Sequence, residues 1–476
     1  MNPTDWQKFI GRVSSMSKTL LPSFVFLCLL VSVIHASSKD KPISVELTPD
    51  WNRSRIEMLL SEIPNRKYQA ISFLSRVAGT DFKSDRIVSV EIKNTDGNWF
   101  AARRASPFVF IVPDEITSMR IIVEIPAPDD VFRRPFVSWM DGGNGAFVLA
   151  DLVPIEFEGP VSVRLPGRDS RQIFSNIESG FVGIFGTASV GKRRDGISIH
   201  RIGDWKVSDD EIETVVKEVV ADYSQRFGRL GGGEIDVVLI RASEAPGKWT
   251  ARTVGSTIII SSSGMPFETQ EMQRLHEQMR HELFHLWIPN SLELKGDYAT
   301  FYEGFALYQS LKSGVATGRI RFVDFLSTLS AALRISEKID SRPAIGDQWR
   351  DDRESLYAAG IVSAFAIDVS LISASGGRRS SDSFIREFIT RYKGSREDAR
   401  IVIREYFSRN ADLNRIGIGD DLMLRRDSIS DILLKAGLRR DGGSLDVVSN
   451  PSSGQKRVLK VLGYNAKAKL IQMPIR

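Results

Sequence analysis

The chain has 476 residues, of which 42% are hydrophobic and 26% charged, an ordinary globular composition with enough length for two or three domains. Its formal net charge is +5, and it contains no run of five or six like charges, so we expect no nucleic-acid-binding arm. The single cysteine, Cys28, excludes a disulfide within the chain, and the fold must therefore rest on its hydrophobic core.

Residues 1–38 have the features of a signal peptide. A basic start is followed by an apolar run from Leu20 to Ala36, and the small residues at 36–38 offer a cleavage site. About 17 apolar positions is short for a membrane span, so cleavage is favoured over the alternative, an uncleaved anchor. We therefore expect an exported protein, periplasmic or secreted from a bacterium, that meets a membrane only if this segment is retained.

Residues 39–190 alternate short β-type runs with turn sequences, which predicts an N-terminal β-rich domain of sandwich or saddle-like form. The predicted strands lie at 43–47, 68–77, 87–92, 108–112, 119–125, 146–150 and 161–165. No set of catalytic side chains falls in this region, so its expected role is structural or substrate-shaping.

The next part of the chain mixes helix and strand patterns. Ser208 and Glu211 form a capping box that opens an amphipathic helix predicted to reach about residue 227. Strands are predicted at 235–240 and 256–261. A segment without Gly or Pro, 269–287, is predicted to be helical and follows the second of these strands.

This helical segment contains His281-Glu282-Leu283-Phe284-His285, an H-E-x-x-H motif. Histidines four positions apart lie one turn apart on one helical face, so both imidazoles can reach one Zn²⁺ at about 2.0 to 2.1 Å. Glu282 then lies beside the metal rather than on it. The alternatives are a surface helix with a solvated His-Glu-His face and a degenerate site that has lost its activity.

A third ligand is available at Glu303, which follows His285 by 18 positions at the start of another predicted helix. Two histidines and a glutamate, with a fourth position open to water, are typical of catalytic rather than structural zinc. One zinc ion there would lower the pKa of a water molecule and polarise a carbonyl, while Glu282 takes the proton as the water attacks.

The rest of the chain is predicted to be mostly helical. Helices are expected at 321–339, 355–374, 381–392 and 395–410, the last with Ser395 as its N-cap, and they should wrap the far side of the site. The last part has turn-rich sequence with one predicted strand, 458–462, and no chemistry is assigned to it. The expected α+β organisation is a signal peptide (1–38), a β-rich domain (39–190), a catalytic domain (191–310), a helical part completing the site (311–437) and a C-terminal tail (438–476).

Three stretches resemble the gluzincin zinc metallopeptidases, closest to the glycyl aminopeptidase family and more distantly to aminopeptidase N. They are His281 to Trp287, Tyr302-Glu303-Gly304-Phe305-Ala306, and Tyr357-Ala358-Ala359-Gly360, which opens an apolar helix containing Asp368. The resemblance implies a thermolysin-like catalytic domain and a peptide or protein substrate.

The same resemblance implies a role for each matching residue. His281, His285 and Glu303 would bind zinc, Glu282 would be the general base, and Tyr357 would donate its hydroxyl to the oxyanion of the tetrahedral intermediate. Without the resemblance, Tyr357 would be interpreted as an aromatic residue packed in the core at a helix start.

One segment departs from the family pattern. Family aminopeptidases hold the substrate amine with a glutamate just before the strand that precedes the zinc helix, the edge strand where a peptide pairs. Here residues 245–267 contain no acidic residue, and Lys248 and Arg252 would repel an ammonium group. We therefore expect a peptidase that is not a typical aminopeptidase. It would cleave within peptides or prefer a substrate carboxylate, with Arg252 and Gly255 as candidate substrate-binding residues.

Two rival functions remain open from sequence. One is a non-catalytic peptide-binding protein on the same scaffold, and the other is a zinc hydrolase acting on a different bond. Glu282 favours an enzyme, because a binder has no need of a non-ligand glutamate in the motif. His276 lies about 140° around the helix from His281 and is expected at the surface, while Glu277 is a candidate acceptor for the free ring N–H of His281. The sequence does not determine the oligomeric state or the cleavage preference.

Overall fold

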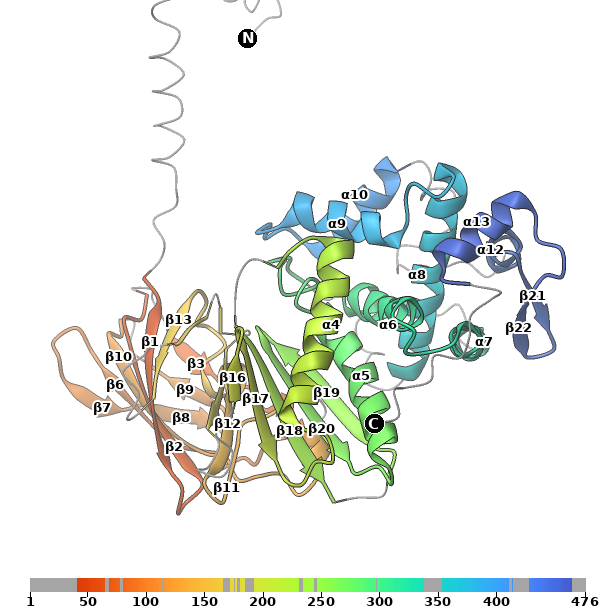
Figure 1. The fold of residues 1–476 in the computed structure, drawn as a ribbon. Coiled ribbons are helices and arrows are strands. Elements are labelled where there is room, and N and C mark those ends of the chain that lie inside the picture. Colours follow the sequence, from red (N-terminus) through yellow and green to blue (C-terminus); the bar gives the residue numbers. More distant parts are fainter. Residues whose placement is uncertain are drawn as a thin grey trace, which may run out of the picture.

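The computed structural model describes residues 41–464, except 65–67, 78–79, 113–114, 166–171, 175, 178–179, 185–191, 231–233, 244–245, 297, 338–352, 411–412 and 414–427. The predicted signal peptide lies outside the described residues. The architecture is mixed α+β, as predicted, with a β-rich N-terminal region and a helical C-terminal part (Figure 1).

The N-terminal region is built on a seven-stranded sheet with the order β14-β13-β1-β2-β10-β6-β7. Buried side chains alternate with more accessible ones along its strands, as in β10, where every second residue from Met119 to Val123 is buried and those between are partly buried. Its strands are β1 (Ile43–Asp50), β2 (Arg55–Ser61), β6 (Ile87–Lys93), β7 (Trp99–Ala101), β10 (Ser118–Glu124), β13 (Val161–Arg164) and β14 (Gln172–Phe174).

Shorter strands complete this region. They are β3 (Ala70–Ser72), β4 (Arg76–Val77), β5 (Thr80–Asp81), β8 (Arg103–Ser106), β9 (Val109–Ile111), β11 (Trp139–Asp141), β12 (Asn144–Val148) and β15 (Phe181–Ile184), with the short helices η1 (Val131–Arg133) and α3 (Leu149–Leu152). All but one of the predicted strands occur, as β1, β6, β9, β10, β12 and β13. The predicted strand at 68–77 is interrupted and divides into β3 and β4.

A second, five-stranded sheet has the order β16-β17-β18-β20-β19. β17 (Ile197–Ile202), β18 (Ile235–Ala242) and β20 (Thr257–Ser263) are parallel, while β16 (Lys192–Arg194) and β19 (Trp249–Val254) are antiparallel edge strands. The prediction that 256–261 is the edge strand was therefore wrong. Gly255, with a φ of 57°, makes a tight hairpin turn that adds β19 outside β20.

The two faces of this sheet are covered by different parts of the chain (Figure 1). On one face, Ile258 and Ile260 belong to the large core shared with the helices, which include α4 (Asp209–Phe227) and α5 (Glu268–Phe284). On the other face, Ile259 and Val254 pack with Trp139 and other residues of the β-rich region. The sheet therefore joins the two halves of the molecule.

The predicted helices behind the sheet occur as α6 (Ala299–Ala316), α7 (Phe322–Ser336), α8 (Arg353–Ser375), α9 (Ser381–Tyr392) and α10 (Ala399–Arg409), the last beginning four residues later than predicted. A further helix, α12 (Ile429–Ala436), was not predicted. The predicted capping box at the start of α4 is formed by Ser208 and Glu211. α8 is long and apolar enough to cross a membrane, but 83% of its most apolar window is buried, as expected for a core helix.

Two predictions about the C-terminal part were wrong. The N-cap of α10 is Asp398 rather than Ser395, because the Asp398 carboxylate accepts from the backbone N–H groups of Arg400 and Ile401. The predicted strand at 458–462 lies mostly in a helix, α13 (Ser453–Val461), which a capping box of Ser452 and Gln455 opens. With the hairpin of β21 (Leu438–Asp441) and β22 (Ser444–Val447), α13 contributes buried residues to the core.

Candidate metal centre

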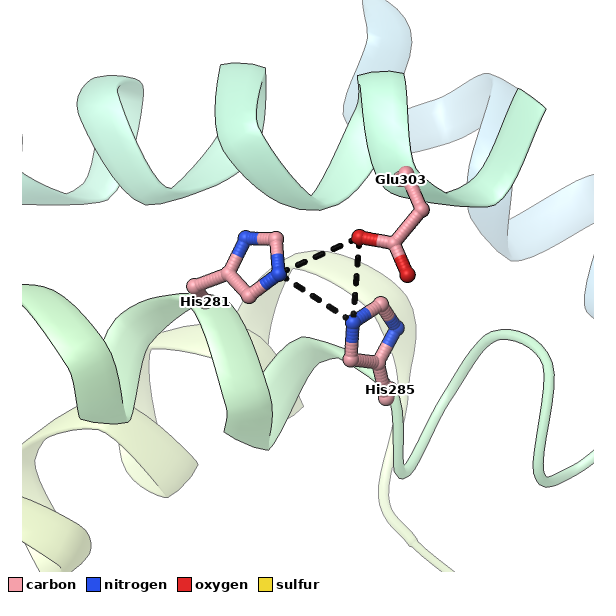
Figure 2. Close-up of side chains that lie close together, drawn as sticks. All are labelled: His281, His285 and Glu303. Atoms are coloured by element: carbon pink, nitrogen blue, oxygen red, sulfur yellow. Dashed lines mark hydrogen bonds and ion pairs between the residues drawn. The ribbon is translucent and has the colours of Figure 1, made fainter. Parts of the chain in front are cut away.

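Three side chains from two helices meet at one point (Figure 2). His281 lies in the last turn of α5, His285 is its C-cap residue, and Glu303 lies in the second turn of α6. The Glu303 Oε2 atom is 3.2 Å from His281 Nε2 and 3.6 Å from His285 Nε2, and the two Nε2 atoms are 3.4 Å apart. The three residues predicted as zinc ligands are therefore brought together.

These separations fit one tetrahedral zinc ion. Four ligand atoms at about 2.0 to 2.1 Å from a central ion lie about 3.3 Å from one another. The observed separations of 3.2, 3.4 and 3.6 Å bracket that value. The donor set, two imidazole nitrogens and one carboxylate oxygen, is also one that zinc prefers.

The hydrogen bonding of His285 prepares its Nε2 atom for a metal. Its Nδ1–H donates to the carbonyl of Ile288 at 3.1 Å, which leaves the lone pair of Nε2 directed toward Glu303. The Nδ1 atom of His281 is buried and has no hydrogen-bond partner among the described residues, while Glu277 is exposed. The contact considered between His281 and Glu277 is therefore not formed.

The electrostatics of the centre favour a cation. Burial alone would lower the pKa of His281, but the hydrogen bond and charge of Glu303, with the nearby charges of Glu282 and Glu277, outweigh burial and raise it. A site that favours a protonated imidazole also favours a bound metal ion.

Glu282 is buried and points to β19 rather than into the ligand set. The Oγ1 atom of Thr253 donates to Glu282 Oε2 at 2.8 Å, and Glu282 Oε1 lies 3.9 Å from His281 Nε2. Thr253 therefore orients a carboxylate that stands next to the metal position without belonging to it. Thr253 was not predicted as a partner of Glu282, because the edge strand was predicted at 256–261 and is instead β19.

Tyr357 lies in the first turns of α8, half-buried. It precedes Gly360 by three positions, and residues three apart share a helical face. Gly360 touches α6 at Gly304, where a Cβ atom placed on Gly360 would lie 2.7 Å from Gly304 Cα. Gly304 directly follows Glu303 in α6. The contact between Gly360 and Gly304 therefore brings the first turns of α8, which contain Tyr357, close to Glu303, the proposed metal ligand.

Arg252 and Gly255 each make a hydrogen bond to a residue outside the proposed ligand set. Arg252 pairs with Ile259 in the β19-β20 ladder and so shares the face that packs on the β-rich region, where its Nη1 donates to the Phe136 carbonyl at 3.2 Å. The Gly255 carbonyl accepts from Asn290 Nδ2 at 2.6 Å. Their predicted role in substrate binding remains a prediction.

His276 was wrongly predicted to lie at the surface. It is 3% exposed, accepts from Arg280 Nη1 at 2.7 Å and donates to Glu218 Oε1 on α4 at 3.1 Å. Arg280 in turn donates to the Ser310 carbonyl on α6 at 2.9 Å. This cluster ties α5 to both neighbouring helices just before the metal-binding turn, and only the tertiary fold brings Glu218 to that face.

No protein-family model matches the chain, and no curated protein matches it. Among solved structures, an aminopeptidase N family protein from Idiomarina loihiensis has 14% sequence identity and a TM-score of 0.64, covering 83% of this chain and 78% of its own. An M1 zinc metallopeptidase from Deinococcus radiodurans has 13% identity and a TM-score of 0.51, covering 81% and 95%. At these identities the likeness shows a shared fold, that of M1 zinc metallopeptidases and aminopeptidase N family proteins.

Proposed function

We propose that this protein is a zinc metallopeptidase, a hydrolase of the gluzincin type. The observation that carries the proposal is the ligand triangle of His281, His285 and Glu303 beside a buried, oriented Glu282 that is not part of it. The fold shared with M1 zinc metallopeptidases supports the same conclusion. The two proposed rivals are a non-catalytic peptide binder and a zinc hydrolase of another bond.

In the proposed mechanism, His281, His285 and Glu303 would hold one zinc ion. When bound, the ion supplies Lewis-acid chemistry, lowering the pKa of a water molecule and polarising the substrate carbonyl. Glu282 takes the proton of the attacking water and passes it to the leaving amine, while its hydrogen bond from Thr253 keeps the carboxylate in position. The phenol hydroxyl of Tyr357 donates a hydrogen bond to the developing oxyanion. One such donor contributes about 2.7 to 4 kcal/mol of transition-state stabilisation in comparable sites.

We further propose that substrates bind along β19 and that a free amino terminus is not required. β19 is the edge of its sheet, the position at which an extended peptide adds by main-chain hydrogen bonds. The segment 245–267 contains no carboxylate, and its cations Lys248 and Arg252 lie on the sheet face toward the β-rich region. An ammonium group therefore finds no counter-charge from this segment.

Export is also part of the proposal. The apolar run at Leu20 to Ala36 after a basic start, and the absence of any cysteine except Cys28 within that run, suit a chain that is processed and resides in the periplasm or outside the cell.

One experiment tests the function and its mechanism together. Zinc content and kcat/KM are measured for the wild type, for Glu282→Gln and for Glu268→Gln, an exposed glutamate in the first turn of the same helix, with N-acetylated and free-amine versions of the same peptides. We expect one zinc in every protein, a loss of about 10²- to 10⁴-fold in Glu282→Gln, unchanged activity in Glu268→Gln, and faster turnover of the acetylated peptides.

Each other outcome has a defined meaning. Zinc-loaded wild type without activity on any peptide favours the binder, and activity on esters alone favours the other hydrolase. Retained activity in Glu282→Gln excludes Glu282 as the base. Free-amine peptides that are turned over equally or better show that the protein works as an aminopeptidase.

A further inference from the structure

One side of β19 is free to hydrogen-bond to another chain. The N–H of Ser263 donates to the Lys248 carbonyl at 3.0 Å, which makes these two residues a hydrogen-bonded pair of the antiparallel ladder. Hydrogen-bonded pairs alternate along an antiparallel ladder with pairs that make no hydrogen bonds to each other. Trp249, Ala251 and Thr253 belong to pairs of the second kind, so their N–H and C=O groups point away from β20. No described strand lies beyond β19 in the sheet order.

The side chains of these three residues share the face that α5 covers. Thr253 is opposite Ile258 and Ala251 opposite Ile260, both members of the core under α5, and alternation along the strand places Trp249 on the same face. At 37% exposure, Trp249 is one of the few large apolar side chains that the fold leaves open.

α5 and β19 lie side by side and run in the same direction. At one end, Thr253 Oγ1 donates to Glu282, and at the other end Arg274 Nη1 donates to the carbonyl of Gly247 at 2.6 Å. Trp249 therefore lies at the end remote from the metal centre, about 13 Å from Thr253 along the strand at about 3.3 Å per residue. Phe267, 65% exposed, precedes the first residue of α5 at this same end.

We propose that Trp249 is a specificity-determining residue that binds an aromatic or large aliphatic substrate side chain on the C-terminal side of the cleaved bond. The inference rests on the proposed peptidase function. A peptide antiparallel to β19 runs from the Thr253 end toward Trp249, so the residues after the cleaved bond are those that reach the indole. The distance places the contact about four residues beyond the metal centre.

The chemistry of the contact follows from its surroundings. The indole offers one open apolar wall, against which an aromatic ring stacks or an aliphatic side chain packs. Main-chain hydrogen bonds from the outward groups of Ala251 and Thr253 would set the register and hold the side chain over the ring. A single wall discriminates less than an enclosed pocket, so we expect a preference of about tenfold for phenylalanine over alanine.

The test uses N-acetylated, internally quenched peptides in which phenylalanine or alanine occupies successive positions after one cleaved bond. Mass spectrometry identifies the bond, and kcat/KM is measured for each peptide. We expect the wild type to prefer phenylalanine about tenfold at one position. The ratio should fall to near one in Trp249→Ala and be mostly kept in Trp249→Phe.

A matched control is Trp99→Ala, because Trp99 is also on an edge strand, at 38% exposure, in the β-rich region. It should keep the wild-type ratio, and zinc content and melting temperature establish that both alanine variants are folded. A wild type that cleaves no peptide overturns the proposed function and the inference with it. Cleavage with a ratio that Trp249→Ala leaves unchanged overturns the inference alone, as does a preference located before the cleaved bond.

Discussion

The crossing of α6 and α8 leaves no room for a side chain, and this gives a sharp test of the role of Tyr357. A Cβ atom on Gly360 would lie 2.7 Å from Gly304 Cα and 2.9 Å from the Thr300 carbonyl oxygen. Carbon atoms pack at about 3.5 to 4.0 Å, so Gly360→Ala requires a separation of the helices by roughly 1 Å. Both contacts are with backbone atoms, which no change of rotamer can relieve.

We expect Gly360→Ala to lower the free energy of unfolding by about 1 to 3 kcal/mol, the usual cost of overpacking. Catalysis should suffer more than stability, because a displacement of about 1 Å at a catalytic group can reduce the rate about 100-fold. Zinc should remain bound, since His281, His285 and Glu303 come from α5 and α6. Gly360→Ala should therefore give a folded protein that contains zinc but has low activity.

The assay combines urea unfolding, zinc content by atomic absorption and kcat/KM on an acetylated peptide. The matched variant is Val369→Ala, which removes buried carbon from α8 at a fully buried position away from Gly304 and should cost about 1 to 3 kcal/mol. If Gly360→Ala and Val369→Ala lose stability equally and keep equal activity, the spacing of α6 and α8 is not critical and the proposed role of Tyr357 is refuted.

Two further predictions concern buried polar groups. Burial and the charge of Arg280 lower the pKa of His276 from 6.5 to about 4. Between these two pH values His276 is protonated in the unfolded chain and neutral in the folded one. The free energy of unfolding should therefore fall by about 3 kcal/mol as the pH drops from 6.5 toward 4. In urea unfolding, His276→Gln should not show this decrease. Equal pH profiles for the wild type and His276→Gln would contradict the prediction. Asp368 is fully buried, 2.9 Å from Lys312 Nζ, and accepts from the Tyr308 hydroxyl at 2.6 Å. Lys312 Nζ also lies 3.0 Å from Asp382 Oδ1, so Asp368→Asn removes one of its two carboxylate partners. We expect a loss of about 2 to 3 kcal/mol for Asp368→Asn, against about 1 kcal/mol for Tyr308→Phe. Equal losses in urea unfolding would show that the ion pair with Asp368 contributes little.

The sequence predicted those features that depend on local spacing. The capping box of Ser208 and Glu211 fixes the start of α4 because both hydrogen bonds lie within one turn. The H-E-x-x-H motif places His281 and His285 on one face of α5, and a single downstream Glu303 at a helix start completes the ligand set. The clustering of the three proposed zinc ligands was therefore predictable from their spacing on two helices.

Features that depend on which elements become neighbours were not predictable. β19 reads as a loop in sequence, since Trp249 to Val254 has polar residues on both faces, and its pairing with β20 depends on the turn at Gly255. The clustered apolar residues of 458–462 predicted a strand, whereas the capping box of Ser452 and Gln455 opens a helix, α13, that includes most of this segment.

α5 shows why one helix could be only partly interpreted from its sequence. His281 and His285 face α6, and their partner could be inferred because zinc chemistry restricts the third ligand to a few residue types. Glu282 meets Thr253 of β19, and His276 meets Glu218 of α4, through ordinary hydrogen bonds that almost any polar residue could make. The residues on the proposed metal-binding face of α5 can thus be identified by the ligand types that zinc requires. The partners of Glu282 and His276 on the other faces depend on which elements pack against α5. Variants of Thr253 and Glu218 should accordingly change activity and stability while leaving the zinc ligand set itself intact.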